Sequence, residues 1–287
     1  MTDEQDPTRL PPDTSLNRIA LRVQDLDEMT RFYRQVVGLD VVARGDSETV
    51  LGVGDEPLLV LPRDGDAPPR QRTQAGLFHT AFRVPSRAAL GSALSRVRDQ
   101  WRLEGASDHG VSEALYLSDP EDNGVELYCD RPREAWPRSA DGTVEMGIRP
   151  LDLDAVAAAA AEAEMVPARA VPAGTAIGHV HLETTSLPAA RSFYVDTLGF
   201  GVQVDDRGAL FLAAGDYHHH VGLNTWNRRS EPAGGRGLAW VEIAVPDGDL
   251  LTTIRSRLTE AGVGCRDVED GLAFEDPDGV DIRVRAE

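Results

Sequence analysis

Histidine, glutamate and tyrosine residues stand at alternating positions in several short segments that have the polarity pattern of β-strands. In a strand, successive side chains point to opposite faces, so the apolar positions mark the face that packs on helices. The residues that this argument places on the other, cavity-lining face are His79, Ala81, Glu126, Tyr128, His179, His181, His218, His220 and Asn224. Two imidazoles and one carboxylate on one face of a metal bind ferrous iron and leave positions open for substrate and oxygen. These segments therefore contain the ligand types of an iron centre.

The segments belong to an internal repeat. Residues 18–41 match residues 179–202 at a constant offset, and the same offset relates GLFHTAFRVP at 76–85 to GLAWVEIAVP at 237–246. The coinciding pairs are Leu21/Leu182, Leu26/Leu187, Phe32/Phe193, Tyr33/Tyr194, Gly38/Gly199 and Val41/Val202. We expect a duplicated chain, with one half at 1–130, a linker with a short alanine-rich helix at 131–175, and a second half at 176–287.

Each half divides again into two smaller units. Residues 18–23 and 79–84 alternate as strands do, and each segment is followed by residues with helical spacing and then by short strands separated by Gly and Asp-Pro turns. The unit is β-α-β-β-β and occurs four times, which predicts an α+β fold. The strands of one unit are too few to close a barrel, so the units must pair and curl around a shared cavity.

Several motifs resemble one known superfamily. Phe-Tyr followed by Leu-Gly after a strand, as in FYVDTLGF, is typical of the vicinal oxygen chelate superfamily, which includes glyoxalases, bleomycin-resistance proteins and type I extradiol dioxygenases. The runs GLFHTAFRVPSR, SDHGVSEALYLSDPEDNGVELYCDRPREAWP, IGHVHL and YHHHVGLNTW are similar to the bacterial catechol-2,3-dioxygenase group. The resemblance covers nearly the whole chain outside the linker. It implies four βαβββ modules that pair into two half-open β-barrels.

In this superfamily the metal ligands come from the first and last strands of paired modules. The first-strand positions are here Arg18, His79, His179 and Trp240, and the last-strand positions of modules two and four are Glu126 and Arg283. Pairing the modules in sequence order gives no complete triad, because arginine does not ligate iron. Pairing module two with module three unites His79, Glu126 and His179 and leaves the other pair without ligands. The alternative is sequential pairing with two degenerate or metal-free sites.

Residues 107–126 resemble the extradiol dioxygenase signature. That signature has a histidine, a tyrosine, Asp/Asn-Pro and the ligand glutamate, which are His109, Tyr116, Asp119-Pro120 and Glu126 in this sequence. The match departs at Ser107 and Asp122, both of which we expect in turns. The resemblance implies that His109 is the acid/base group that assists O–O cleavage and that Tyr116 donates a hydrogen bond to a substrate oxygen.

Taken together, these features predict an Fe(II)-dependent extradiol dioxygenase that cleaves the ring of a catechol-type diol with O2. Manganese is the alternative metal, and His218, His220 and Asn224 are candidate substrate-binding residues. A fourth ligand, such as His220, would favour a glyoxalase- or isomerase-like enzyme. A non-catalytic binder of a small molecule or antibiotic, as in bleomycin-resistance proteins, would need no metal.

Composition narrows the choice of partners. The formal net charge of the 287-residue chain is −19, which argues against nucleic acid or an anionic membrane as partner. All 29 basic residues are arginine, and an acid-rich, lysine-free composition indicates a high-salt (halophilic) cytoplasm; GC-rich coding bias is the other explanation.

The N-terminus lacks the pattern of a signal peptide, so a cytoplasmic location is expected by default. Cys129 and Cys265 are expected to be buried thiols. A homo-oligomer is compatible with the sequence, which leaves the oligomeric state open.

Overall fold

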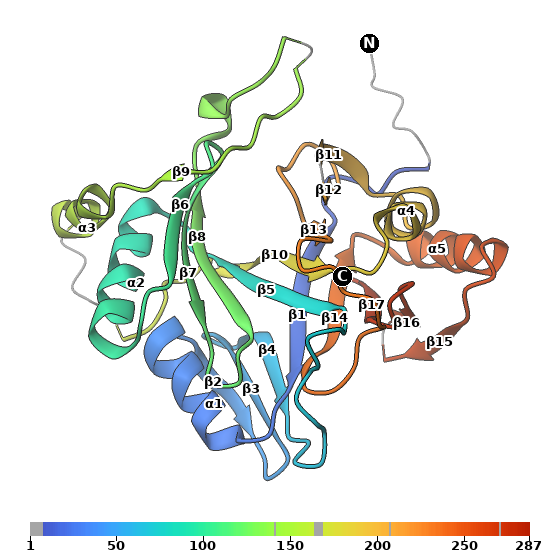
Figure 1. The fold of residues 1–287 in the computed structure, drawn as a ribbon, viewed down its shortest axis with the longest axis horizontal. Coiled ribbons are helices and arrows are strands. Elements are labelled where there is room, and N and C mark those ends of the chain that lie inside the picture. The colour runs from blue at the N-terminus through green and yellow to red at the C-terminus, as the bar shows by residue number, and fades with distance from the viewer. Residues whose placement is uncertain (1–7, 141, 164–168, 207, 270) are drawn as a thin grey trace. The chain divides into compact units, whose positions relative to one another are not determined.

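The computed structural model describes residues 8–287 except 141, 164–168, 207 and 270. Its strands form two mixed sheets, one of eight and one of nine strands, together with helices, which confirms the α+β class (Figure 1). The chain divides into two compact units. The first contains the described residues of Met1–Ile19, Pro68–Leu77 and His179–Glu287, and the second contains Ala20–Ala67 and the described residues of Phe78–Gly178. No helix among the described residues is long and apolar enough to cross a membrane.

The first two predicted modules follow the order β-α-β-β-β. Module one is β1 (Ser15–Arg22), α1 (Leu26–Phe32) with its continuation η1 (Tyr33–Val37), β2 (Asp40–Arg44), β3 (Glu48–Val53) and β4 (Glu56–Pro62). Module two is β5 (Gly76–Arg83), α2 (Arg87–Gln100), β6 (Gly105–Asp108), β7 (Ser112–Ser118) and β8 (Gly124–Asp130). The region 131–175 contains η2 (Arg133–Ala135), β9 (Arg149–Pro150) and the expected alanine-rich helix α3 (Leu153–Glu162). Small residues let α3 pack closely on α2, since Gly91 lies directly against Val156 and Ala160.

The last two modules repeat this order. Module three is β10 (Ala176–Glu183), α4 (Leu187–Arg191) with η3 (Ser192–Thr197), β11 (Gly201–Asp206), β12 (Ala209–Ala213) and β13 (Val221–Asn224). Module four is β14 (Gly237–Val245), α5 (Gly248–Glu260), β15 (Cys265–Val268), β16 (Gly271–Glu275) and β17 (Asp281–Ala286). The four-module prediction is therefore confirmed, whereas the exact domain limits stay a prediction.

In modules two, three and four, the first and last strands are parallel neighbours. His79 lies opposite Gly124 and Ala81 opposite Glu126 in the β5–β8 pair, and β10–β13 and β14–β17 pair in the same way. The antiparallel β7–β8 pair places Tyr116 directly opposite Glu126. Because strand pairing sets side chains of neighbouring strands beside one another, residues far apart in sequence share one face of a sheet. This geometry explains how ligands from a first and a last strand can converge.

The two copies of the Phe-Tyr motif anchor the helices in the same way. Tyr33 Oη donates to Asp119 Oδ2 at 2.9 Å, and in the repeat Tyr194 Oη donates to Asp276 Oδ2 at 3.0 Å. Burial raises the pKa of Asp119 and that of Asp276 to about 6, and the hydrogen bonds that each carboxylate accepts act in the opposite direction. The Asp-Pro turns therefore hold the helices to the sheets through buried side-chain hydrogen bonds.

A short arm precedes each half of the chain. The N-terminal arm, residues 8–14, belongs to the first unit, where Leu10 N donates to Gly199 O at 2.9 Å. The arm at residues 169–175 belongs to the second unit, where Val171 N donates to Gly38 O at 2.8 Å. Gly38 and Gly199 have φ angles of +94° and +96°, which favour glycine at the helix ends where the arms dock. The internal repeat thus begins upstream of the first strand of each half.

The N-terminal arm is expected to contribute to stability through Leu10, which is only 4% exposed. Leu10→Ala should lower the free energy of unfolding by about 2 kcal/mol or more, because it removes buried methyl groups and leaves a cavity. The exposed neighbour provides a matched control, since Asp13→Ala should change it by less than about 0.5 kcal/mol. Urea unfolding of both variants measures the difference, and equal midpoints would show that the arm does not pack on the protein in solution.

Candidate metal centre

A buried imidazole–carboxylate pair lies in the second unit. His79 Nε2 on β5 is 2.9 Å from Glu126 Oε2 on β8, and the two side chains are 9% and 3% exposed. Their strands are parallel neighbours, which brings the two side chains to the same face. A carboxylate and an imidazole at this distance, shielded from water, are suited to holding a divalent cation.

His79, Glu126 and His179 together form one group of possible metal ligands. One ligand atom from each residue lies within 4.8 Å of the others, and all three residues are buried. Among the residues that the structure describes, it is the one such group of three or more. Two imidazoles and one carboxylate fit a divalent first-row metal and leave coordination positions for other ligands. The donor set thus fits the metal type that the sequence predicts, whereas the identity of the ion stays a prediction.

Tyr116 and His109 form a chain of polar contacts that leads to Glu126. Tyr116 forms a side-chain hydrogen bond with Glu126, and its Oη lies 2.7 Å from His109 Nε2. His109 Nδ1 lies 2.7 Å from the Gly147 carbonyl, which can only accept, so Nδ1 carries a proton. The tyrosine hydroxyl has one proton, so it donates either to Glu126 or to Nε2 of neutral His109. When it donates to Glu126, the contact with His109 requires a proton on Nε2, which then donates to Tyr116 Oη. The proton on Nε2 thus determines the direction of the hydrogen bond to Tyr116.

Burial keeps the Tyr116 hydroxyl in its protonated form. Desolvation raises the pKa of Tyr116 above its ordinary value, and the nearby Glu126 carboxylate raises it further. Tyr116 therefore remains a hydrogen-bond donor at neutral pH, which agrees with the role that the sequence predicts for it.

The two departures from the signature lie in different surroundings. Asp122 lies in a turn with φ of +65°, where glycine is favoured, as expected. Ser107 lies within β6 rather than in the expected turn.

Two residues of the histidine triplet lie beside His179 in the first unit. The rings of His219 and His218 lie 4.1 Å and 6.2 Å from the ring of His179, and His218 Nδ1 is 2.8 Å from His219 Nδ1. His219 was not among the sequence candidates. The alternation argument assumed a strand at this point, but β13 begins only at Val221, so His218, His219 and His220 precede it and all three are buried. The triplet itself was the signal that could have identified His219.

The other sequence candidates in this unit are buried and have defined partners. His220 Nδ1 accepts from the backbone N of Ala214 at 3.2 Å. Asn224 Nδ2 lies 3.1 Å from His181 Nε2, and Asn224 Oδ1 accepts from Trp226 N at 3.1 Å. Asn224 therefore orients His181, which the strand pattern placed on the same face as His179. The substrate-binding roles of His218, His220 and Asn224 stay predictions.

The equivalent positions of the other modules carry no ligand set. Arg18 donates to both oxygens of Glu242 at 2.8 Å, and the Arg283 guanidinium lies 4.1 Å from the centre of the Trp240 ring. The Glu242 hydrogen bond raises the pKa of Arg18, so the guanidinium stays charged. An ion pair and a cation–π contact thus occupy the strand positions that hold histidine and glutamate elsewhere in the chain.

Of the two predicted buried thiols, one is buried. Cys129 is buried, and burial raises the pKa of its thiol to about 12, which keeps it protonated. Cys265 is half-buried, because it lies at the start of the short strand β15.

One family model matches both halves of the chain. The family model "Glyoxalase/Bleomycin resistance protein/Dioxygenase superfamily" matches residues 15–127 and 176–284. The chain is 35% identical over 277 residues to the catechol-2,3-dioxygenase of Bacillus subtilis (strain 168), which covers 94% of this chain and 96% of the relative. A shorter match, 33% identical over 119 residues, is to biphenyl-2,3-diol 1,2-dioxygenase 3 of Rhodococcus globerulus and covers 40% of this chain and 63% of that protein.

Solved structures share the fold at low sequence identity. Glyoxalase I from Zea mays superposes with a TM-score of 0.59 at 16% identity, covering 94% of this chain and 92% of that chain. A Bacillus subtilis protein whose dioxygenase assignment is itself inferred gives a TM-score of 0.63 at 15% identity, with 97% and 86% covered. The matched regions, the four βαβββ modules and the full-length relative agree, and the chain belongs to the Glyoxalase/Bleomycin resistance protein/Dioxygenase superfamily.

Proposed function

We propose that this protein is an extradiol dioxygenase that cleaves the ring of a catechol-type diol with O2 at a ferrous site formed by His79, Glu126 and His179. The observation that carries the proposal is the buried group of two imidazoles and one carboxylate. The full-length similarity to a catechol-2,3-dioxygenase supports the reaction class. A ferrous ion bound there would supply coordination sites for the diol and the transfer of electron density to O2.

The group combines residues of modules two and three, so these are the modules we propose to share the active cavity. His79 and Glu126 come from module two, and His179 comes from module three. One carboxylate and two neutral imidazoles leave a divalent ion with a net charge of about +1, which favours a catecholate as ligand. A site with three protein ligands keeps positions open, which distinguishes it from a glyoxalase-like site with a fourth ligand.

His109 and Tyr116 are the proposed proton-handling pair. Neutral His109 holds its Nδ1 proton toward Gly147, so Nε2 can take up a proton released as the diol binds and return it during ring cleavage. The Tyr116 hydroxyl, which stays protonated, can hold a substrate oxygen in place. We assign His218, His220 and Asn224 to the wall of the substrate cavity. The position of the His218 ring, 6.2 Å from the ring of His179, supports the assignment of His218.

Reconstitution under anaerobic conditions tests the proposal. Protein loaded with Fe(II) and given catechol should produce the yellow ring-cleavage product only after air is admitted, and manganese-loaded protein tests the alternative metal. A zinc- or nickel-loaded sample should give no product. Isomerase activity with zinc or nickel, together with no ring cleavage with iron or manganese, would contradict the proposal.

A further inference from the structure

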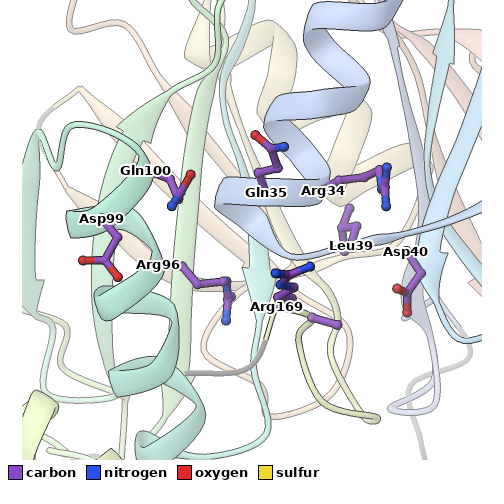
Figure 2. Close-up of a pocket in the computed structure, with 9 residues that line it drawn as sticks. Arg34, Gln35, Leu39, Asp40, Arg96, Asp99, Gln100 and Arg169 are labelled. Atoms are coloured by element: carbon purple, nitrogen blue, oxygen red, sulfur yellow. The ribbon is translucent and has the colours of Figure 1, made fainter. Parts of the chain in front are cut away.

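A cavity of about 490 Å³ opens in the second unit, and none of the proposed metal ligands or proton-handling residues lines it (Figure 2). Its wall combines η1, the start of β2, the C-terminal part of α2 and the first two residues of the arm at 169–175. The lining residues are Arg34, Gln35, Leu39, Asp40, Arg96, Asp99, Gln100, Arg169 and Ala170. Three arginines therefore line one cavity in a chain whose formal net charge is −19; Arg96 is buried, whereas Arg34 and Arg169 are exposed.

Arg96 lines this cavity and is held in place by backbone carbonyls. It is 6% exposed, and its Nη2 and Nε donate to the carbonyls of Val37 at 2.8 Å and Val36 at 3.4 Å. Burial lowers the pKa of Arg96 to about 10, so the guanidinium still carries its charge at neutral pH. The second half of the chain repeats this contact, since Arg257 Nη1 lies 3.4 Å from the Leu198 carbonyl. Arg96 is thus held by the same contact with the end of the preceding helix as its equivalent in the second half of the chain.

The fold itself does not need a basic residue at the positions of Arg34 and Arg169. Their repeat equivalents are Val195 and Thr8, so the helix end and the arm form without a basic residue at either position. In the part of the chain that the structure describes, neither guanidinium makes a hydrogen bond or an ion pair with another residue. The first half of the chain therefore has two additional cationic groups that make no bonds of their own within these residues.

The acidic residues of the wall balance these charges only in part. In Figure 2 the Arg96 side chain extends from α2 toward Arg169, whereas Asp99 extends from the same helix away from Arg169. Asp40 is exposed at the start of β2. The amides of Gln35 and Gln100 add neutral donors to the wall. The cavity therefore presents an excess of positive charge and of N–H groups.

We propose that this cavity is a binding site for a small oxyanion, a phosphate or carboxylate group held by Arg34, Arg96 and Arg169. Guanidinium groups donate paired N–H bonds to both kinds of anion, and a buried arginine contributes a preorganised one. Because Arg169 belongs to the arm that docks on Gly38 through Val171, a bound anion would also tie this arm to the first repeat.

Isothermal titration calorimetry of the full chain at low ionic strength tests this site. We expect saturable binding of inorganic phosphate, succinate or both, and the two titrations show which oxyanion the cavity takes. Arg34→Ala and Arg169→Ala should each weaken binding about tenfold or more. Arg98→Ala is the matched control, because Arg98 is an exposed arginine of α2 that does not line the cavity.

Three results would overturn the proposal: no saturable binding of either anion, unchanged affinity in both cavity variants, or an equal loss in the Arg98 variant, which would indicate a diffuse charge effect. Thermal unfolding of each variant without anion verifies that it is folded. Arg169→Gln, which keeps the donors but removes the charge, should bind more weakly than the parent and provides a second test if Arg169→Ala unfolds. None of these measurements depends on the metal or on ring cleavage.

Discussion

Replacing His79, Glu126 or His179 by alanine is expected to abolish retention of the divalent metal and, with it, ring cleavage. Loss of an outer hydrogen-bond partner alone costs about 10- to 100-fold in metal affinity or activity, so loss of a direct ligand from a set of three should exceed that range. Metal analysis by mass spectrometry after anaerobic loading and desalting, together with product formation from catechol, measures both effects. The three variants should behave alike, because each leaves only two of the three protein ligands.

Trp240→Phe provides the control at the repeat position equivalent to His79. Trp240 packs against Arg283 and belongs to no ligand group, so its conservative replacement should leave metal content unchanged. A His179 variant that kept its full complement of iron would refute the pairing of modules two and three. Circular dichroism of every variant separates loss of metal from loss of fold.

His109→Phe should lower turnover by about 10²–10⁴ while the protein keeps its metal, since that range is expected when one acid/base group is lost. The imidazole lies between the Gly147 carbonyl and the Tyr116 hydroxyl, each at 2.7 Å, so phenylalanine removes the proton carrier without removing a proposed ligand. Turnover assays with catechol and metal analysis of the parent and the variant measure the two effects.

His109→Asn separates proton transfer from positioning. Asparagine can still form hydrogen bonds at this position but cannot carry a proton between substrate and solvent. It should therefore be as slow as the phenylalanine variant if His109 is the acid/base group. Recovery of near-parent turnover would show that His109 only positions Tyr116, and loss of metal in either variant would contradict the assignment.

The sequence by itself determined the repeated architecture and the chemical character of the site. The repeat at constant offset and the β-α-β-β-β pattern depend on local periodicity, which residues near one another in the chain decide. The same periodicity placed Tyr116 on the face of Glu126, and the pairing of β7 with β8 sets these two residues directly opposite each other. The repeated positions also showed which modules lack histidine or carboxylate at the ligand positions.

Tertiary structure decided the contacts that depend on irregular segments and on partners distant in sequence. Local alternation could not place the histidine triplet, because it precedes β13, and only the folded loop shows that His219 contacts His179. Gly147 reaches His109 from the linker, across 38 residues of chain. The hydrogen bond from Leu10 N to Gly199 O likewise joins residues that are far apart in the sequence. Loop geometry and long-range hydrogen bonds have no sequence period, so these contacts become visible only when the chain is folded.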